Sequence, residues 1–284
     1  MKNLLVKSYA KINICLNVTG KQEDGYHTLD MVMLPLQLHD SLLISEVKNG
    51  TDNFVTIDDF SMGDIQYNLA TFAIDTLQKK YGFKNKFRVL IHKILPIQAG
   101  LGGGSSNAAA TMLAVNKYLK LNLTDEEMIE IGKKLGADVP FFLKNVPARC
   151  QGIGEIMTPV TVKNNYYVLI VKPAAGCSTK EIYNLADTMD IETCDVDTVI
   201  HALETGDDDL LASSIGNSLE KAAISKVPEV QVIKDLLKEK GFKICMMSGS
   251  GSSVFALSTD KRLVKKTADE LEDKYRVEVT KVLK

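Results

Sequence analysis

Residues 96–110 limit the possible folds of this chain most strongly, because they are unusually rich in glycine: PIQAGLGGGSSNAAA. Four glycines and two serines fall within residues 100–106. A β-rich run, 87–91, precedes them, and strong helix formers follow over 108–120. A strand, a glycine loop and a helix in this order aim backbone N–H groups and the positive helix end at an anion. We therefore expect a phosphate-binding loop, with the serines capping the helix. A glycine-rich surface turn is the alternative.

The glycine-rich segment matches neither of the two common phosphate loops. A Walker A loop has Lys and then Ser or Thr after its last glycine, whereas Gly104 is followed by Ser105-Ser106-Asn107. A dinucleotide fingerprint needs an acidic residue about 20 residues further on, at the end of a second strand. Asp125 and Glu126 lie at that distance, but they fall in the first turn of an expected helix. We expect a third kind of loop.

Composition places the chain among soluble globular proteins of one or two domains. It has 284 residues, of which 45% are hydrophobic and 25% charged. The net charge of −2 gives no overall attraction to nucleic acid or to an anionic membrane. No apolar run reaches the roughly 20 residues of a membrane span, and the N-terminus lacks a signal-peptide core. We expect a cytoplasmic protein.

The cysteines support this location. They are odd in number, scattered and free of C-x-x-C spacing, which argues for reduced thiols and against a disulfide framework or a zinc site. Four of the five have apolar or small neighbours and are expected to be buried. The five are Cys15, Cys150, Cys177, Cys194 and Cys245.

Hydrophobic periodicity predicts mixed helices and strands. Strands are expected over 4–18, 31–38, 41–47, 53–57, 86–94, 166–172, 244–247, 254–257 and 277–283, and a strand edge or tight loop over 149–155. Helices are expected over 67–81, 108–119, 124–135, 179–185, 197–203, 207–214, 227–240 and 261–275. We place two domains at 1–163 and 164–284. The second is expected to be an α+β domain with helices backing an antiparallel sheet.

Three polar features stand out from this framework. Lys11 and Asn13 lie in an apolar strand, where a lysine is costly to bury without an anionic partner; a lysine that reaches the solvent from a sheet edge is the alternative. The turn Asp24-Gly25-Tyr26-His27 carries an aromatic ring and an imidazole. Asp138 follows a helix end, where an Asx turn or a helix cap is the ordinary explanation.

The order of these features resembles the GHMP kinases, the family of galactose, homoserine, mevalonate and phosphomevalonate kinases. Three segments look like the family's motifs and span nearly the whole chain: Tyr9 to Asn13, Pro96 to Ala110, and Ser248 to Gly251. The resemblance implies ATP-dependent phosphorylation of an alcohol. It also implies an α+β fold of two domains, the N-terminal one similar to a ribosomal-protein fold and the C-terminal one a ferredoxin-like α/β sandwich.

Five segments resemble one branch of the family in particular, whose alcohol is linked to cytidine diphosphate. They are 10–13, 24–27, 100–109, 136–141 and 152–155. The branch implies a CDP-linked polyol as the small-molecule substrate. A kinase for another alcohol, such as homoserine or mevalonate, is the alternative, and the turn at 24–27 discriminates between them because only a nucleotide substrate needs a pyrimidine platform.

The resemblance also implies roles for individual residues. Asp138 is expected to accept the proton of the substrate hydroxyl, and Lys11 to lie beside it and stabilise charge on the transferred group. Expected ATP-binding residues are Asn68, Leu69, Lys93, Pro96, Ala99, Gly100, Leu101, Gly102, Gly103, Gly104, Ser105 and Ser106. Expected substrate-binding residues are Asn13, Tyr26, His27, Gly249 and Gly251.

ATP is expected with Mg²⁺, for which no protein ligand is assigned, since phosphates and water can hold it. We expect a monomer or homodimer without nucleic-acid or membrane partners. A non-catalytic sensor on the same fold would be expected to lack Lys11 or Asp138, and both are present. The near-neutral charge argues against RNA binding.

Overall fold

The computed structural model describes residues 3–23, 25–58 and 68–284, and these form two compact units. Unit 1 comprises Met1–Ala10, His39–Leu95 and Gly102–Asn145. Unit 2 comprises Lys11–Leu38, Pro96–Leu101 and Val146–Lys284. Strands β1 (Leu4–Lys21) and β2 (His27–Glu46) each contribute to both units. The units therefore interleave along the chain, and the expected domain boundary after residue 163 stays a prediction.

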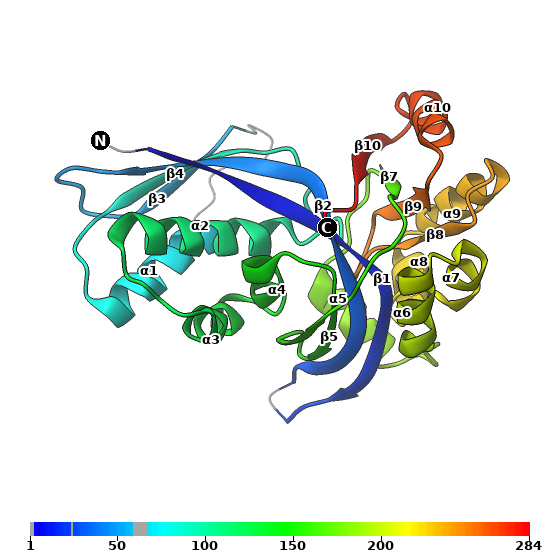
Figure 1. The fold of residues 1–284 in the computed structure, drawn as a ribbon, viewed down its shortest axis with the longest axis horizontal. Helices are drawn as coiled ribbons and strands as arrows, with labels where there is room; N and C mark the ends of the chain where they lie inside the picture. The colour runs from blue at the N-terminus through cyan, green and yellow to red at the C-terminus, as the bar shows by residue number, and fades with distance from the viewer. Residues whose placement is uncertain (1–2, 24, 59–67) are drawn as a thin grey trace. The chain divides into compact units, whose positions relative to one another are not determined.

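Unit 1 packs helices against a sheet. Its elements are β3 (Phe54–Ile57), α1 (Leu69–Tyr81), β4 (Phe87–His92), α2 (Gly103–Leu119), α3 (Asp125–Leu135) and α4 (Val139–Lys144). Strand β4 is antiparallel to the second half of β2, with Ser41 opposite His92, and parallel to β3. Phe87, Val89 and Ile91 alternate into the core. Helices α1 and α2 lie side by side next to these strands (Figure 1).

The helix ends of unit 1 follow local sequence signals. Asn68 caps α1 by accepting a hydrogen bond from the N–H of Ala70, and Gly82 ends the helix with a positive φ of 73°. Thr124 and Glu127 form the expected capping box of α3. These boundaries were predictable because each depends on residues within one turn. Tyr67, at the expected start of the first helix, lies outside the described residues.

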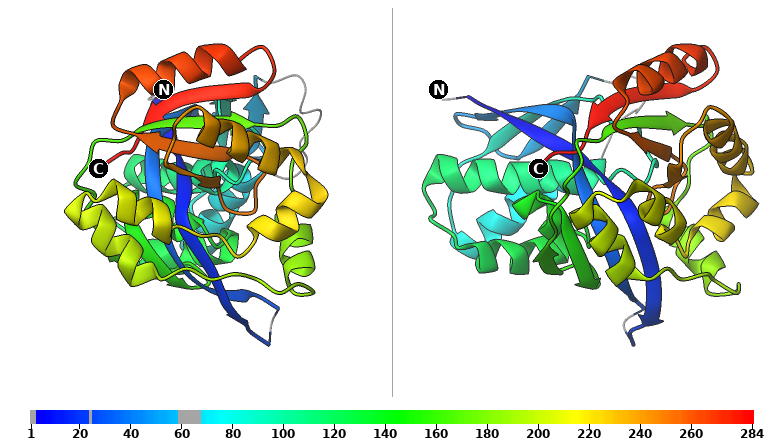
Figure 2. Two further views of the ribbon diagram at one scale, coloured as in Figure 1. Left: turned by 90° about the vertical axis from the view of Figure 1, so that its right-hand side faces the viewer. Right: turned by 45° about the vertical axis from the view of Figure 1, so that its right-hand side comes forward.

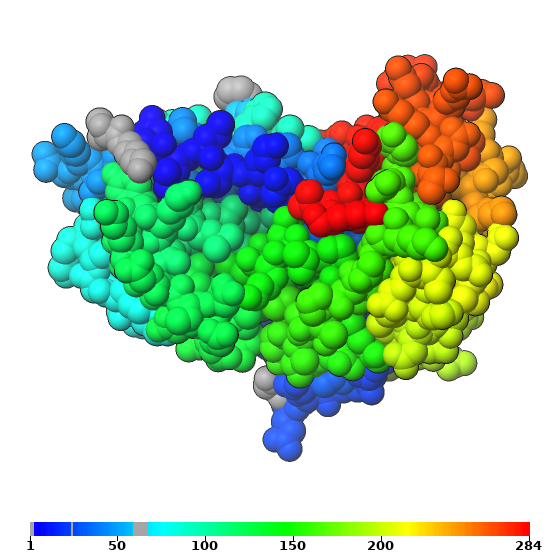
Figure 3. Space-filling model, in the orientation of Figure 1, coloured from blue at the N-terminus to red at the C-terminus, as the bar shows by residue number. Residues whose placement is uncertain are grey.

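Unit 2 contains the predicted helix-backed antiparallel sheet. Strand order is β10-β7-β9-β8, and every pair is antiparallel. The strands are β7 (Tyr167–Lys172), β8 (Ile244–Met247), β9 (Val254–Ser258) and β10 (Arg276–Lys281), and the helices are α5 (Thr179–Ala186), α6 (Val196–Thr205), α7 (Asp208–Ser214), α8 (Glu220–Lys226), α9 (Glu229–Glu239) and α10 (Lys261–Leu271). Helix α10 runs along β10 (Figure 2) and is exposed on its outer side (Figure 3).

The first half of β2 forms a further antiparallel pairing in unit 2. It pairs with β5 (Ala148–Gly152), which pairs in turn with β6 (Ile156–Pro159). The expected strand edge or tight loop at 149–155 is thus a hairpin. Four of the five cysteines are buried, as predicted, and Cys194 is half-buried. Among the helices that the structure describes, none has the length and apolar character needed to cross a membrane.

Three differences between the expected and the observed elements lie outside the glycine-rich segment. A single strand, β2, replaces the two strands expected over 31–38 and 41–47. The polar stretch around Asp40 does not interrupt it, because the Asp40 carboxylate points inward and is fully satisfied there. Oδ1 accepts hydrogen bonds from the N–H groups of Ile94 and Leu95 at 2.8 and 2.7 Å, and Oδ2 lies 2.5 Å from Lys93 Nζ.

The other two errors concern helices. The helix expected over 227–240 begins later, at Glu229 after Pro228, and the unpredicted α8 precedes it. Helix α4 was also unpredicted, although Pro140 is compatible with a first helical turn, where a proline removes no helical hydrogen bond. In both cases a proline at the start of a helix was a local signal for a boundary that hydrophobic periodicity alone did not reveal.

We expect Asp40→Ala to lower the free energy of unfolding by about 3–5 kcal/mol, because it leaves the Lys93 ammonium buried without its partner. The Lys93 side chain is only 8% exposed and that of Asp40 is fully buried. Urea denaturation measures the change. Glu130→Ala, which removes the exposed pair with Lys133, is the control and should cost less than about 1 kcal/mol. Equal losses of unfolding free energy in the two variants would contradict the stabilising role of the buried Asp40–Lys93 pair.

Candidate active site

The glycine-rich segment is partly helical. Gly102 is the N-cap of α2 with a φ of 72°, so Gly103, Gly104 and the two serines form its first helical positions. The expected start at residue 108 and the expected serine caps are wrong, because the N-cap is a glycine without a side chain. The first N–H groups of a helix have no partner within it. The first turn of α2 therefore offers bare amides and a positive helix end, which suit an anion.

Other residues that we predicted to bind ATP lie next to this turn within unit 1. A Cβ built on Gly103 would lie 3.2 Å from Lys93 Nζ, and one on Gly104 would lie 3.6 Å from Leu69 Cδ1. The start of α1 and the Lys93–Asp40 pair thus adjoin the first turn of α2. Sequence reasoning missed Asp40, whose role depends on the approach of a strand end 53 residues further along the chain.

The Asp138 turn lies against the same helix end. A Cβ on Gly136 would stand 3.5 Å from Ser105 Oγ. Asp138 occupies the N-cap position of α4, but its side chain makes no capping hydrogen bond to the described residues of that helix. Helix capping by the carboxylate therefore does not explain this aspartate. Unit 1 brings the Asp138 turn and the first turn of α2 together.

Lys11 and Asn13 form a second cluster, in unit 2. Lys11 is 4% exposed, and its Nζ donates a hydrogen bond to Asn13 Oδ1 at 2.5 Å. A Cβ on Gly249 would lie 3.1 Å from Lys11 Nζ and 3.3 Å from Asn13 Oδ1. The Lys11 N–H donates to the Leu101 carbonyl at 3.1 Å. The strand lysine is thus buried, which rules out the solvent-reaching alternative.

The first half of the glycine segment meets the Ser248–Ser253 loop backbone to backbone. A Cβ on Gly100 would lie 1.9 Å from the Ser248 carbonyl oxygen, and its φ is 72°. Ser248 Oγ donates to the Gly100 carbonyl at 2.9 Å, and the N–H of Ser253 donates to the Ala99 carbonyl at 3.3 Å. Only glycine fits at position 100. Both motifs therefore belong to one rigidly bonded cluster within unit 2.

Pro96, Leu101 and Gly251 are the remaining predicted residues of this cluster. Pro96 and Leu101 are buried. The N–H of Gly251 donates to the Ser248 carbonyl at 2.9 Å, and a Cβ at Gly251 would lie 2.6 Å from Met247 Sδ. Its φ of 83° also favours glycine. Gly251 therefore shapes the loop through its backbone.

The turn containing Tyr26 and His27 forms a third cluster, also in unit 2. His27 Nε2 lies 2.6 Å from Asp187 Oδ1, and its ring centre lies 4.7 Å from that of Tyr183. Lys21 donates to Asp187 at 2.6 Å, and this bond, with a smaller contribution from His27, lowers the pKa of Asp187 below its usual value. Tyr26 is 55% exposed. Asp24 lies outside the described residues.

Sequence reasoning missed Tyr183 and Asp187. Both come from the segment around α5, about 160 residues after the turn, as the separation of 160 between His27 and Asp187 shows. The available signal was weak: one aromatic and one acidic residue on an amphipathic helix, a pattern that surface helices commonly show. Tertiary contacts were needed to connect them with His27.

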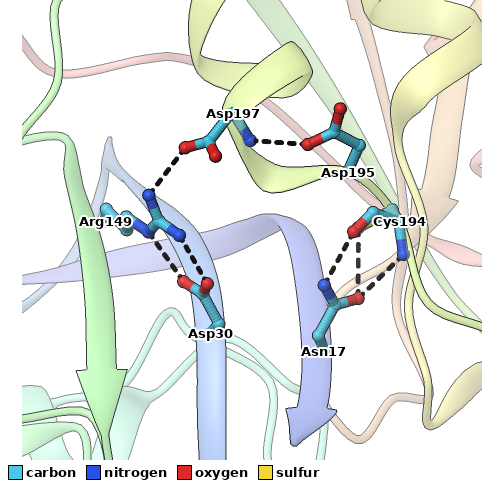
Figure 4. A network of polar contacts seen from close by, with 6 residues as sticks. All are labelled: Asn17, Asp30, Arg149, Cys194, Asp195 and Asp197. Carbon is cyan, nitrogen blue, oxygen red and sulfur yellow. Dashed lines mark hydrogen bonds and ion pairs between the residues drawn. The ribbon is translucent and has the colours of Figure 1, made fainter.

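A polar network anchors the start of α6 and the residues just before it (Figure 4). Arg149 makes two hydrogen bonds to Asp30, at 2.8 and 2.6 Å, and a third to Asp197 at 2.8 Å. The bonds to Asp30 raise the pKa of Arg149 above its usual value. Asn17 bonds both backbone polar groups of Cys194, at 2.9 and 2.8 Å. The network fastens residues 194–197 to strands β1, β2 and β5.

Comparisons with known proteins identify the family of this chain. Two family models match, one described as the GHMP kinases N terminal domain over residues 68–145 and one as the GHMP kinases C terminal domain over residues 199–277. The 4-diphosphocytidyl-2-C-methyl-D-erythritol kinase of Clostridium perfringens is 36% identical over 272 residues, which cover 95% of this chain and 94% of that protein. The chain belongs to the GHMP kinase family.

Solved structures confirm the predicted two-domain α+β GHMP kinase fold. A crystal structure of 4-(cytidine 5'-diphospho)-2C-methyl-D-erythritol kinase matches with a TM-score of 0.81 and 28% identity, covering 99% of this chain and 100% of that one. The homoserine kinase of Cytophaga hutchinsonii matches with a TM-score of 0.76 and 18% identity, covering 100% and 95%. The second likeness shows the fold alone.

In this GHMP kinase, the predicted site residues gather in three clusters. Unit 1 holds the first turn of α2 with Leu69, Lys93 and the Asp138 turn. Unit 2 holds Lys11 and Asn13 beside the two glycine loops, and separately the His27 turn. Lys11 and Asp138 belong to different units, so their pairing stays a proposal.

We expect Gly249→Ala to lower kinase turnover about 10-fold to 100-fold, because its Cβ displaces Lys11 Nζ and Asn13 Oδ1. Steady-state kinetics measure this loss. Gly82→Ala is the matched control: Gly82 also has a positive φ, but nothing lies within 4 Å of its Cβ position. Both variants carry a backbone cost of about 1–2 kcal/mol. Equal turnover in both variants would show that backbone strain, and not the contact with Lys11, decides.

Proposed function

We propose that this GHMP kinase transfers the γ-phosphoryl group of ATP to the 2-hydroxyl of 4-diphosphocytidyl-2-C-methyl-D-erythritol, in the non-mevalonate route to isoprenoids. The observation that carries the proposal is the likeness to kinases of that name over 95% of the chain at 36% identity. The turn that contains Tyr26 and His27 supports it, since it offers groups that suit a pyrimidine. The expected cytoplasmic location and the monomeric or homodimeric state stay predictions.

The first turn of α2 is the proposed site of the ATP phosphates. Its amides, its positive end and the Ser105 and Ser106 hydroxyls provide donors without bulky side chains over Gly103 and Gly104. Asn68 and Leu69 open α1 beside this turn and are proposed to border the adenine, with Lys93. Lys93 is held by Asp40, so its ammonium is fixed before nucleotide arrives.

Asp138 and Lys11 are the proposed catalytic residues. Asp138 would accept the proton of the 2-hydroxyl as that oxygen attacks the γ-phosphorus in line with the leaving ADP oxygen. Lys11 would stabilise the negative charge of the transferred phosphoryl oxygens. The buried Lys11 is already oriented by Asn13, whose amide would also reach the erythritol portion of the substrate. Gly249, next to both, leaves room for this arrangement.

The His27 turn is the proposed cytosine platform. The Asp187 carboxylate can only accept a hydrogen bond, so His27 Nε2 carries the proton in the neutral ring. That assignment leaves Nδ1 as an acceptor, which matches the exocyclic amino group of cytosine. The exposed ring of Tyr26 offers a stacking face. Asp187 and Tyr183 therefore orient the imidazole for a pyrimidine edge.

Magnesium is proposed to arrive with ATP. The described residues include no group of three or more His, Cys, Asp and Glu side chains that could hold a metal. We propose that phosphate oxygens and water hold most of the ion's coordination positions, as Mg²⁺ usually keeps several waters. Such an ion neutralises charge on the β- and γ-phosphates.

A kinase for homoserine or mevalonate is the competing function, because the homoserine kinase likeness shows that the same fold serves another alcohol. Measuring ATP consumption with each of the three alcohols tests the proposal. We expect turnover with the CDP-linked alcohol and turnover at least about 10⁴-fold lower with the other two, since a site built for hydrogen bonds rejects molecules that lack them. Turnover of mevalonate or homoserine alone would refute the substrate assignment.

We expect Asp138→Asn to cut turnover by about 10²-fold or more while leaving ATP affinity nearly intact, because the amide cannot accept the hydroxyl proton. Single-turnover kinetics and nucleotide titration measure the two quantities. The exposed Asp269 on α10 provides a control, Asp269→Asn, with wild-type kinetics. Preserved turnover in Asp138→Asn would reduce Asp138 to a group that only positions the substrate.

A further inference from the structure

Lys172, the last residue of β7, carries a buried ammonium that binds backbone carbonyls. The residue is 9% exposed. Its Nζ donates to the carbonyl oxygens of Pro173, Ala175 and Ala174 at 2.9, 3.3 and 3.5 Å. Burial, together with repulsion from Arg276, lowers the pKa of Lys172. Three carbonyl oxygens thus surround one ammonium, much as oxygen ligands surround a bound cation. The ammonium belongs to the last residue of a strand, so its position is set by the sheet.

Burying an ammonium is costly unless its hydrogen bonds are made, so the contacts of Lys172 need an explanation. A strand end does not itself require a buried charge. Residues 174–176 are exposed, yet their loop turns its carbonyls inward to the ammonium. Without Lys172, these carbonyls would be free to turn to solvent. Lys172 therefore fixes the backbone path of residues 173–177, which we call the 173–177 loop.

The 173–177 loop in turn holds the Ser248–Ser253 loop. Ser252 Oγ donates to the Ala175 carbonyl at 2.6 Å, so this carbonyl binds both Lys172 and Ser252. Thr179, just beyond the loop, lies 3.0 Å from Ser250 through the two hydroxyl oxygens. Two side chains of the Ser248–Ser253 loop are thus attached to the segment that Lys172 fixes.

The same loop holds the first half of the glycine segment. The Cys177 N–H donates to the Gln98 carbonyl at 3.3 Å, and the Ser252 N–H shares that carbonyl at 3.4 Å. A Cβ on Gly176 would lie 2.7 Å from Gln98 Oε1. Gln98 also has a positive φ of 50°, unusual for a residue with a side chain. This strained residue needs outside support, and the 173–177 loop provides it.

We propose that Lys172 is a positioning residue whose ammonium gathers the 173–177 carbonyls and so fixes Gln98–Gly100 and the Ser248–Ser253 loop relative to each other. The proposal rests on the proposed function where it concerns nucleotide, because these segments adjoin the proposed phosphate site along the chain. Misplacement of such segments by about 1 Å can lower turnover about 100-fold. Lys172 touches no substrate in this role and acts only through the backbone.

Hydrogen exchange of the full, ligand-free chain tests the anchoring directly. In Lys172→Ala, we expect amide exchange in peptides covering 173–179, which contain the Cys177 N–H bonded to Gln98, and 248–253 to rise at least about tenfold, while peptides from α10 keep the wild-type rate. Added ethylammonium should restore protection by replacing the missing cation. Lys281→Ala is the matched control, because Lys281 lies on β10 of the same sheet but is exposed over Tyr167.

Lys172→Met separates charge from packing and replaces the alanine variant if that one does not fold. Met keeps a similar stem but cannot donate, so exchange in both segments should rise as it does in Lys172→Ala. Wild-type exchange in Lys172→Met would overturn the proposal. ATP titration is the second readout, with at least about tenfold weaker binding expected in both variants. Failure of the wild type to bind ATP would refute the proposed function, while the exchange result would still decide the anchoring.

Discussion

The backbone contact between Gly100 and Ser248 is the constraint that joins the two glycine loops of unit 2. No side chain fits at position 100, since its Cβ would stand 1.9 Å from a carbonyl oxygen. The contact is secured by the bonds of Ala99 and Gly100 to Ser253 and Ser248. Because the two loops are joined in this way, Gly249 comes close enough to border Lys11. Gly100 therefore serves contact between the loops, a role separate from the phosphate binding proposed for the first turn of α2.

Elements governed by neighbouring residues were predictable from the sequence. The alternation of Phe87, Val89 and Ile91 gave β4, and the capping box of Thr124 and Glu127 gave the start of α3. Element boundaries that depend on distant groups were not. Asp40 looked like a strand end because its partners, the amides after β4, lie more than 50 residues away. The early start of α2 was hidden by glycine, which has low intrinsic helix propensity.

The residues of the candidate site likewise fall into those that the sequence revealed and those that only the tertiary structure revealed. Sequence order and resemblance found the residues with distinctive local signals, such as the glycine loops and a lysine within an apolar strand. They did not find the groups that hold those residues: Asp40 for Lys93, Asp187 for His27, and Lys172 for the backbone of the loops. Such supporting groups are common residue types without special spacing. Their function appears only when tertiary structure supplies the partner.

The fold alone does not choose the alcohol, since a homoserine kinase shares it at 18% identity. In the proposed function, the groups that discriminate between alcohols are those that a small alcohol could not use. Asp187 binds one nitrogen of His27, and the proposal assigns the other to a hydrogen bond from cytosine. A substrate without a pyrimidine would leave that acceptor and the exposed Tyr26 ring to water and gain nothing from them. In the proposed function, substrate choice thus depends on a hydrogen-bonded imidazole that lies outside the proposed phosphate site.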